Sequence, residues 1–219
     1  MPYAIVQSKG SNNGYSAGPI TLTFSSSTAA GNTIVVSLTS NSASVSSVTD
    51  NKGNTYTRAV QFNTTRLAQI WYCAGISGGA SHQISINLSG FAYVSLCIYE
   101  VSGLDSSPLG ATGTASTASA TALSATLSAT PPSGNLIVAA WGSYNYPSTF
   151  TVNSGYSADY DYHLATNYNL VAFHRTADGA GNTAGASWAF ACDGQLVAAE
   201  FKLPAVTTKH FLLTMGCGT

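Results

Sequence analysis

Charge is what this sequence has least of. Lys, Arg, Asp and Glu make up 7% of its 219 residues, against about 25% in ordinary globular domains. The 7 basic and 8 acidic residues nearly cancel, which leaves a formal net charge of −1. Seven scattered cations do not form the basic surface on which nucleic-acid binding depends, so we expect no nucleic-acid partner.

Several other features are missing. No apolar run approaches the roughly 18 residues that a membrane-spanning helix needs, so we expect no transmembrane segment. The four cysteines, Cys73, Cys97, Cys192 and Cys217, have no CxxC spacing, which argues against a zinc site. Cys73 and Cys97 lie in apolar stretches and are expected to be buried thiols, with a disulfide between them as the alternative. No nucleophile elbow, HExxH motif, P-loop or dinucleotide fingerprint occurs, which weighs against an enzyme and suggests no cofactor.

The N-terminus, Met1 to Gln7, lacks the charged and apolar segments of a signal peptide and resembles a first strand. Either a signal has been removed or the protein never used one, as a virion protein made in a host cytoplasm would not. Ser, Thr, Gly, Ala and Asn take the place of the missing charges, and such a composition is typical of extracellular, cell-wall or virion proteins. We therefore expect a virion or an extracellular, cell-surface location.

What the sequence does have is a succession of short, strand-like stretches. Residues 45–56 show the pattern: a β-branched run, turn residues at 50–53 and a second extended run, which predict a hairpin. Similar stretches follow at the regular short spacing of a sandwich or barrel, many alternating apolar and polar residues. The stretch Tyr93–Val101 is nearly continuously apolar and is expected to be a central strand covered on both faces. The predicted fold class is all-β, an antiparallel β-sandwich of jelly-roll-like topology.

An internal repeat divides the chain. Gly-Asn-Thr-Ile-Val-Val at 31–36 matches Gly-Asn-Leu-Ile-Val-Ala at 134–139, an offset of 134 − 31 = 103 residues, and Glu100 has a counterpart in Glu200. We predict one domain, residues 1–204, built from two similar halves at about 1–105 and 106–204. The segment Ala111–Ser133 still alternates, so we expect an edge strand pair there; a flexible linker is the alternative.

The domain is expected to close at Pro204, because proline cannot donate to a continuing ladder. Residues 205–219 form a C-terminal extension of different character. We expect it either to dock on its own domain or to act as an assembly strand that adds to a neighbouring copy. The apolar candidates for such assembly are Phe211, Leu212, Leu213 and Met215.

The acidic residues offer few sites for chemistry. Glu100 and Glu200 could form the carboxylate pair of a glycoside hydrolase, but a carboxylate at the end of a core strand more often accepts hydrogen bonds from a loop, so we predict no catalytic residue. Asp50 and Asn54 are weak calcium-ligand candidates, and turn hydrogen bonding explains them without a metal.

Aromatic residues are more informative, and six of the 12 tyrosines crowd between residues 144 and 168 in the second half. Exposed rings stack on the C–H faces of sugars, while Asp and Asn bind sugar hydroxyls; packing at strand ends or subunit contacts is the alternative. At strand spacing Asp159 and Asp161 would share a face with His163, able to hold Ca²⁺ or a sugar, although a solvated strand face is the more ordinary interpretation. The glycan-contact candidates are Tyr144, Tyr146, Tyr156, Asp159, Tyr160, Asp161 and Tyr162.

Four stretches give the chain a resemblance to a known family. They are Gly-Asn-Thr-Ile-Val-Val at 31–36, Ser-Val-Thr-Asp-Asn-Lys-Gly-Asn-Thr-Tyr at 47–56, Ile-Trp-Tyr at 70–72 with Gly-Gly-Ala at 78–80, and Tyr-Glu-Val-Ser-Gly-Leu-Asp at 99–105. From about residue 3 to 204 the chain resembles β-sandwich modules of secreted bacterial surface proteins and of phage minor tail or other virion proteins. The resemblance implies an adhesive or structural role without a catalytic set.

We therefore expect a non-enzymatic structural or adhesive protein of a virion or extracellular surface assembly. Its partners would be copies of itself or other virion or surface proteins, bound through its termini, with a possible glycan-contact face. A carbohydrate-binding module of a secreted protein is the alternative. A glycoside hydrolase using Glu100 and Glu200 is a third hypothesis.

Overall fold

The structure is a computed structural model, which describes the whole chain except residues 1, 42–44, 65, 145–148, 163–168 and 206–219. The described residues form fourteen β-strands in three antiparallel sheets. This part of the chain contains no helix long and apolar enough to cross a bilayer. The all-β antiparallel class expected from the alternating sequence is confirmed.

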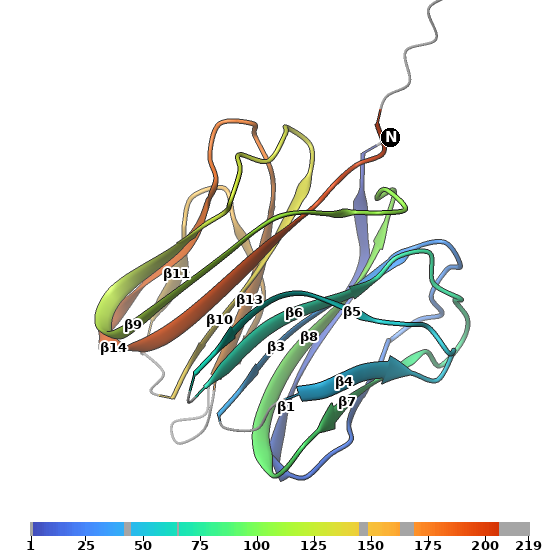
Figure 1. The fold of residues 1–219 in the computed structure, drawn as a ribbon, viewed down its shortest axis with the longest axis horizontal. Coiled ribbons are helices and arrows are strands. Elements are labelled where there is room, and N and C mark those ends of the chain that lie inside the picture. Colours follow the sequence, from blue (N-terminus) through green and yellow to red (C-terminus); the bar gives the residue numbers. More distant parts are fainter. Residues whose placement is uncertain (1, 42–44, 65, 145–148, 163–168, 206–219) are drawn as a thin grey trace, which may run out of the picture.

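The strands divide between a five-stranded, a three-stranded and a six-stranded sheet (Figure 1). The first has the order β1 (Ala4–Ser16), β8 (Ala92–Ser102), β3 (Thr33–Ser40), β6 (Leu67–Cys73), β5 (Thr57–Asn63). The second has the order β2 (Ile20–Thr23), β7 (Gln83–Leu88), β4 (Val45–Asp50). The third has the order β11 (Phe150–Val152), β14 (Thr183–Phe201), β10 (Leu136–Ser143), β13 (Asn169–Thr176), β12 (Ser157–Tyr162), and β9 (Leu109–Thr126) also pairs with β14.

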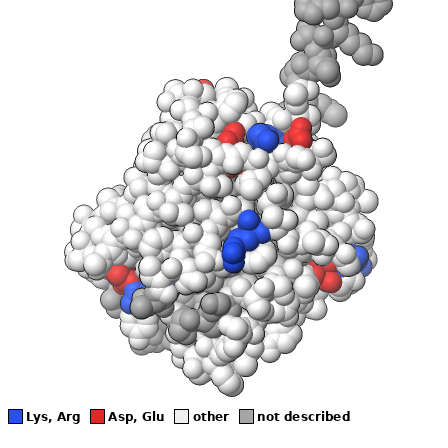
Figure 2. Space-filling view, viewed as in Figure 1, with Lys and Arg blue, Asp and Glu red and all other residues white. Residues whose placement is uncertain are grey.

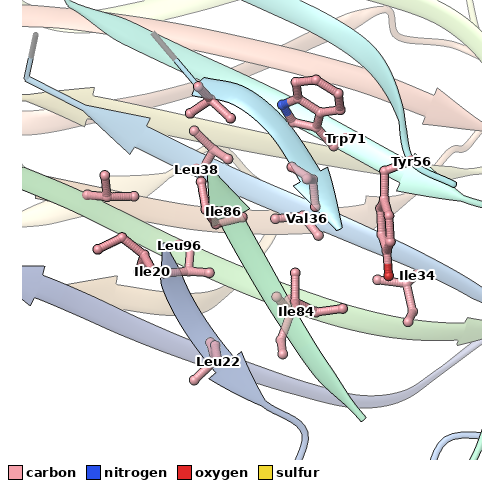
Figure 3. Packing of buried hydrophobic residues seen from close by; sticks show 14 of the residues in the cluster. Ile20, Leu22, Ile34, Val36, Leu38, Tyr56, Trp71, Ile84, Ile86 and Leu96 are labelled. Atoms are coloured by element: carbon pink, nitrogen blue, oxygen red, sulfur yellow. The ribbon is translucent and has the colours of Figure 1, made fainter. Parts of the chain in front are cut away.

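The buried apolar residues form three clusters that fill the spaces between the layers of strands. The first lies between the three-stranded sheet and one face of the five-stranded sheet, where Ile84 and Ile86 meet Val36, Leu38 and their neighbours (Figure 3). The second lies on one face of the six-stranded sheet, where the long, bent strands β9 and β14 fold over the side chains of β10 and β13. Every member of the first cluster falls between residues 20 and 98, and every member of the second between residues 111 and 198.

The third cluster joins the two larger sheets. Val35, Ile70 and Tyr99 of the five-stranded sheet pack with Val138 and Phe201 of the six-stranded sheet, and all five are fully buried. Strand β8 therefore contributes alternate residues to the first and third clusters, which confirms that it is a central strand covered on both faces.

Gly10 lies where β1 meets β12, and a Cβ there would overlap the ring of Tyr160. We expect Gly10→Ala to lower the free energy of unfolding by about 1–3 kcal/mol, because the added methyl overpacks a closed interface. The matched control is Gly14→Ala on the same strand, where a Cβ meets nothing within 4 Å. Urea denaturation measures both; equal effects would contradict this packing of β1 on β12.

The hairpin predicted over residues 45–56 is wrong. Strand β4 pairs with β7 in the three-stranded sheet, whereas β5 begins only at Thr57 and pairs with β6 in the five-stranded sheet. Between them the chain crosses from one sheet to the other, and the ring of Tyr56 is buried in the first cluster. Turn residues at 50–53 are present, but they lead out of the sheet and not back along it.

Most of the Ala/Ser/Thr-rich segment Ala111–Ser133 is strand and not linker, while residues 127–133 lie outside any strand. Its strand part belongs to β9, which pairs with β14 from Leu109 to Thr126. Where a strand pair was expected, there is one long strand whose partner carries register shifts between Ser187 and Gly194. Bulges of this kind bend a strand without ending it.

The described cysteines Cys73, Cys97 and Cys192 are free and buried. The expected burial of Cys73 and Cys97 is confirmed, and the disulfide alternative is not formed. Burial raises the pKa of the Cys97 thiol to about 12. Cys217 lies outside the described residues.

Candidate functional site

On the face shown in Figure 2, charged side chains form small, separate groups among uncharged residues. Among the described residues, no three His, Cys, Asp or Glu side chains gather closely enough to hold a metal ion. Candidate sites must therefore be sought in polar networks, exposed aromatic rings and cavities.

Asp159 and Asp161, expected to share a face, have different surroundings. Asp159 lies in a register shift of β12, accepts a 3.1 Å hydrogen bond from the Tyr99 hydroxyl and is 2.8 Å from Nδ1 of His174. Asp161 is exposed on the opposing side of the strand from the stacked rings of Tyr160 and Tyr162, whose centroids are 6.0 Å apart. His163 lies outside the described residues. Asp159 thus links the two larger sheets.

The tyrosine candidates are also dispersed. Tyr156 is buried in the second cluster, and its hydroxyl donates to the carbonyl of Thr183. Tyr160 packs against the third cluster. Tyr144 is 45% exposed, so its ring can meet a ligand. Tyr146 lies outside the described residues.

Glu100 is fully buried at the end of β8 and binds three donors. Its Oε1 accepts hydrogen bonds from the backbone N–H of Ala29 (2.7 Å) and from Nδ2 of Asn32 (2.6 Å), and its Oε2 accepts one from Nε2 of Gln7 (2.7 Å). The carboxylate therefore fastens β1 and the loop before β3 to the centre of the sheet.

Glu200 makes an equivalent network on β14. Its Oε1 accepts a 2.6 Å hydrogen bond from Nδ2 of Asn135, and its Oε2 accepts one from the backbone N–H of Ala111 (2.7 Å). Oδ1 of Asn135 in turn accepts the N–H of Leu203. Like Glu100, Glu200 pairs with the Asn of a Gly-Asn sequence that precedes a central strand.

A buried hydroxyl, imidazole and carboxylate form a chain that sequence analysis missed. Nδ1 of His82 is 2.7 Å from the Thr28 hydroxyl, and Nε2 is 2.8 Å from Oδ2 of Asp50. An ionised carboxylate only accepts, so Nε2 of His82 carries a proton toward Asp50. The side chains of His82 and Asp50 are fully buried and Thr28 is 5% exposed, so the order resembles a catalytic triad without access for a substrate.

Asp50 also holds in place the segment that leads from β4 in one sheet to β5 in the other. It accepts hydrogen bonds from the backbone N–H of Lys52 (2.9 Å) and Asn54 (3.0 Å), from Nδ2 of Asn54 (2.7 Å) and from the Tyr56 hydroxyl (3.0 Å). Burial alone would raise the pKa of Asp50, but the hydrogen bonds from Asn54, His82 and Lys52 outweigh it and lower the pKa to about 2. Asp50 and Asn54, the weak calcium candidates, bind each other and the surrounding chain.

Two exposed aromatic rings stack beside the first half of the molecule. Tyr15 at the end of β1 and Phe91 before β8 are 60% and 59% exposed, with ring centroids 5.3 Å apart, and Tyr93 lies at the same distance from Tyr15. We call these three residues the aromatic patch. The sequence signal was available, since Phe91 follows the turn residues Ser89 and Gly90, but the crowd of tyrosines in the second half drew the prediction there.

A second surface lies where the described chain begins and ends. A cavity of about 600 Å³, here called the terminal groove, is lined by Pro2, Pro132, Ser133, Asn135, Lys202, Leu203 and Pro204. Proline rings and the Leu203 side chain make much of it apolar. The predicted assembly residues Phe211, Leu212, Leu213 and Met215 lie outside the described residues.

The chain matches no family model, no curated protein and no solved structure. The structure agrees with the resemblance to surface and virion modules only in its all-β architecture of antiparallel sheets. The family itself is not identified.

Proposed function

We propose that this chain is a non-enzymatic structural or adhesive protein of a virion or an extracellular surface assembly, which associates with copies of itself or with other proteins of that assembly. The use of its carboxylates carries the proposal. At least seven of the eight acidic residues accept hydrogen bonds that hold strands, turns or loops in place. The seven are Asp50, Glu100, Asp105, Asp159, Asp178, Asp193 and Glu200.

A glycoside hydrolase is the weaker hypothesis for the same reason. Its two carboxyl groups must face one sugar from opposite sides. Glu100 and Glu200 instead accept hydrogen bonds from different loops, and each lies with less than 5% of its surface exposed. A carbohydrate-binding module, which needs no catalytic acid, remains the stronger alternative.

The fold we propose is a pair of jelly-roll-like sandwiches, one in each half of the chain. A jelly roll pairs its strands in nested order, the first with the last and inward from there. Strands β1 and β8, β2 and β7, and β3 and β6 pair in this way. In the second half β9 with β14 and β10 with β13 repeat it. Matching registers support the repeat, since Ile34 lies opposite Glu100 and Ile137 opposite Glu200.

Assembly is proposed to use the terminal groove. It is a cavity with apolar walls beside Pro204, and residues 205–219 bring Phe211, Leu212, Leu213 and Met215. A segment of that composition on a neighbouring copy would bury apolar side chains in the groove, which stabilises association by about 25 cal/mol per Å² of apolar surface removed from water.

We expect the full-length chain to form particles larger than its 22.4 kDa monomer, and a chain ending at Pro204 to be monomeric. Light scattering and electron microscopy of the same samples measure this. Phe211→Asp is the matched variant of unchanged length and should weaken association, whereas Thr208→Asp should do so much less. Monomers of equal stability in all four samples would overturn the assembly proposal.

A further inference from the structure

A second cavity lies between the two larger sheets, apart from the terminal groove and the aromatic patch. Its volume is about 350 Å³, near the lower end of the roughly 300–1,000 Å³ that small-molecule sites occupy. It lies between the end of β5 and start of β6 on one side and the bend of β9 and β14 on the other. The side chains that matter are Phe62, Arg66, Ser116, Thr117, Asp193 and Gln195.

Asp193 points into this cavity because β14 bulges there. The register of β14 against β9 shifts between Cys192 and Gly194, so Asp193 has no residue opposite it in the ladder. A bulge re-aims the side chain of its extra residue, and bulges are frequent beside functional sites. The Ser143 hydroxyl donates to Oδ1 of Asp193 at 3.3 Å and helps to fix its direction.

Arg66 closes the cavity from the opposite side. Its guanidinium forms an ion pair with Asp193, and the two side chains stay 26% and 16% exposed. The guanidinium carbon of Arg66 also lies 5.4 Å from the centre of the Tyr144 ring. The side chain of Phe62 adds an apolar face to the lining, and the exposed ring of Tyr144 lies beside Arg66 at the edge of the cavity.

The chemistry of this lining determines the kind of ligand. Arg66 and Asp193 are the charged side chains of the lining, and their charges cancel. Arginine donates, carboxylate accepts, and the amide of Gln195 and the hydroxyls of Ser116 and Thr117 do both. A neutral molecule with many hydroxyls and one apolar face matches all of these groups, and that description fits a sugar ring.

We propose that this cavity binds a neutral saccharide, a mono- or disaccharide unit, with Arg66 and Asp193 hydrogen-bonded to its hydroxyls and Tyr144 against its C–H face. The inference deepens the glycan-contact part of the proposed function and rests on it, but not on self-assembly. The proposed glycan contact is therefore at the cavity between the two larger sheets and not at the tyrosines of β12. Of the glycan-contact residues predicted from the sequence, it keeps Tyr144.

The test is titration of the full chain with neutral sugars, namely glucose, galactose, mannose, N-acetylglucosamine and lactose, by calorimetry and saturation-transfer NMR. Glucuronic acid and N-acetylneuraminic acid are the charged comparisons. Arg66→Ala, Asp193→Asn and Tyr144→Ala are each expected to weaken binding about tenfold, the size of one lost hydrogen bond to a charged group or one lost ring contact. The control is Arg58→Ala, because the Arg58 guanidinium lies 5.5 Å from the Trp71 ring centre, outside the cavity.

Each outcome of these titrations either supports or overturns the proposed saccharide site. Binding of a neutral sugar that the three variants weaken and Arg58→Ala leaves within twofold supports the proposal. Tyr144→Ala changes an exposed side chain, so it keeps the test valid if Asp193→Asn unfolds. Binding that no variant affects overturns this site and leaves the proposed function standing, and binding of charged sugars alone overturns the neutral ligand. If no sugar binds, the inference fails, while the particle masses judge assembly independently.

Discussion

Replacing Glu100 with alanine is expected to lower the free energy of unfolding by about 3–5 kcal/mol. The substitution leaves three donors without their acceptor at once: the N–H of Ala29 and the side-chain amides of Asn32 and Gln7. A buried donor left without a partner costs about 1–3 kcal/mol, and local rearrangement recovers part of the sum. Urea denaturation followed by tryptophan fluorescence measures the loss.

Two further variants make this test specific. Glu200→Ala removes the acceptor of two donors, at Asn135 and Ala111, and should cost less than Glu100→Ala. Asp161→Ala removes an exposed carboxylate and should stay within about 0.5 kcal/mol of the parent. If Glu100→Ala were as stable as Asp161→Ala, the carboxylate of Glu100 would not be fastening the loops, and the main support for a non-enzymatic role would go with it.

Asp50→Ala is expected to destabilise the protein by a similar amount, about 3–5 kcal/mol. His82 would lose the acceptor of its Nε2 proton in a fully buried position, and the crossing from β4 to β5 would lose its central acceptor. The matched variant is Thr28→Val, which removes only the hydroxyl at the other end of the chain of hydrogen bonds and should cost about 1 kcal/mol.

The contribution of the Asp50 carboxylate to stability should also depend on pH. The pKa of Asp50 is about 2 in the folded protein, below the ordinary value of 3.8 that it recovers on unfolding. Its stabilising contribution is therefore fully present above the unfolded pKa and is lost as the pH falls through about 2, because the unfolded chain binds the proton first. Between these values the parent should lose stability more steeply than Asp50→Asn. Parallel slopes in denaturation series from pH 5 to pH 2.5 would contradict the assignment.

Local pattern was enough to predict most of the strands. Alternation along Tyr93–Val101 follows from the two faces of β8, each of which packs against a different cluster. The repeat at residues 31–36 and 134–139 likewise marks two central strands, β3 and β10, in matching surroundings. Strand position and strand burial depend on local sequence and on contact with water, and both are reflected in which residues along a strand are apolar.

Sheet membership and the candidate site could not be predicted in this way. Strand β4 does not turn back on β5, and Asp50 at its end meets His82, which lies 32 residues further along. The ion pair of Arg66 with Asp193 joins residues 127 positions apart, since 193 − 66 = 127, and it needs a bulge that nothing in the sequence near Cys192 announces. Contacts of this range are set by the packing of whole layers.

The layering also governs how the chain can fold as it is synthesised. Residues 20–98 contain every member of the first cluster, so that core can close before the second half has been made. Closing it leaves Val35, Ile70 and Tyr99 on a bare face of the five-stranded sheet until β10 and β14 arrive to cover it. Until then the nascent protein carries a broad adhesive surface of the kind that promotes aggregation.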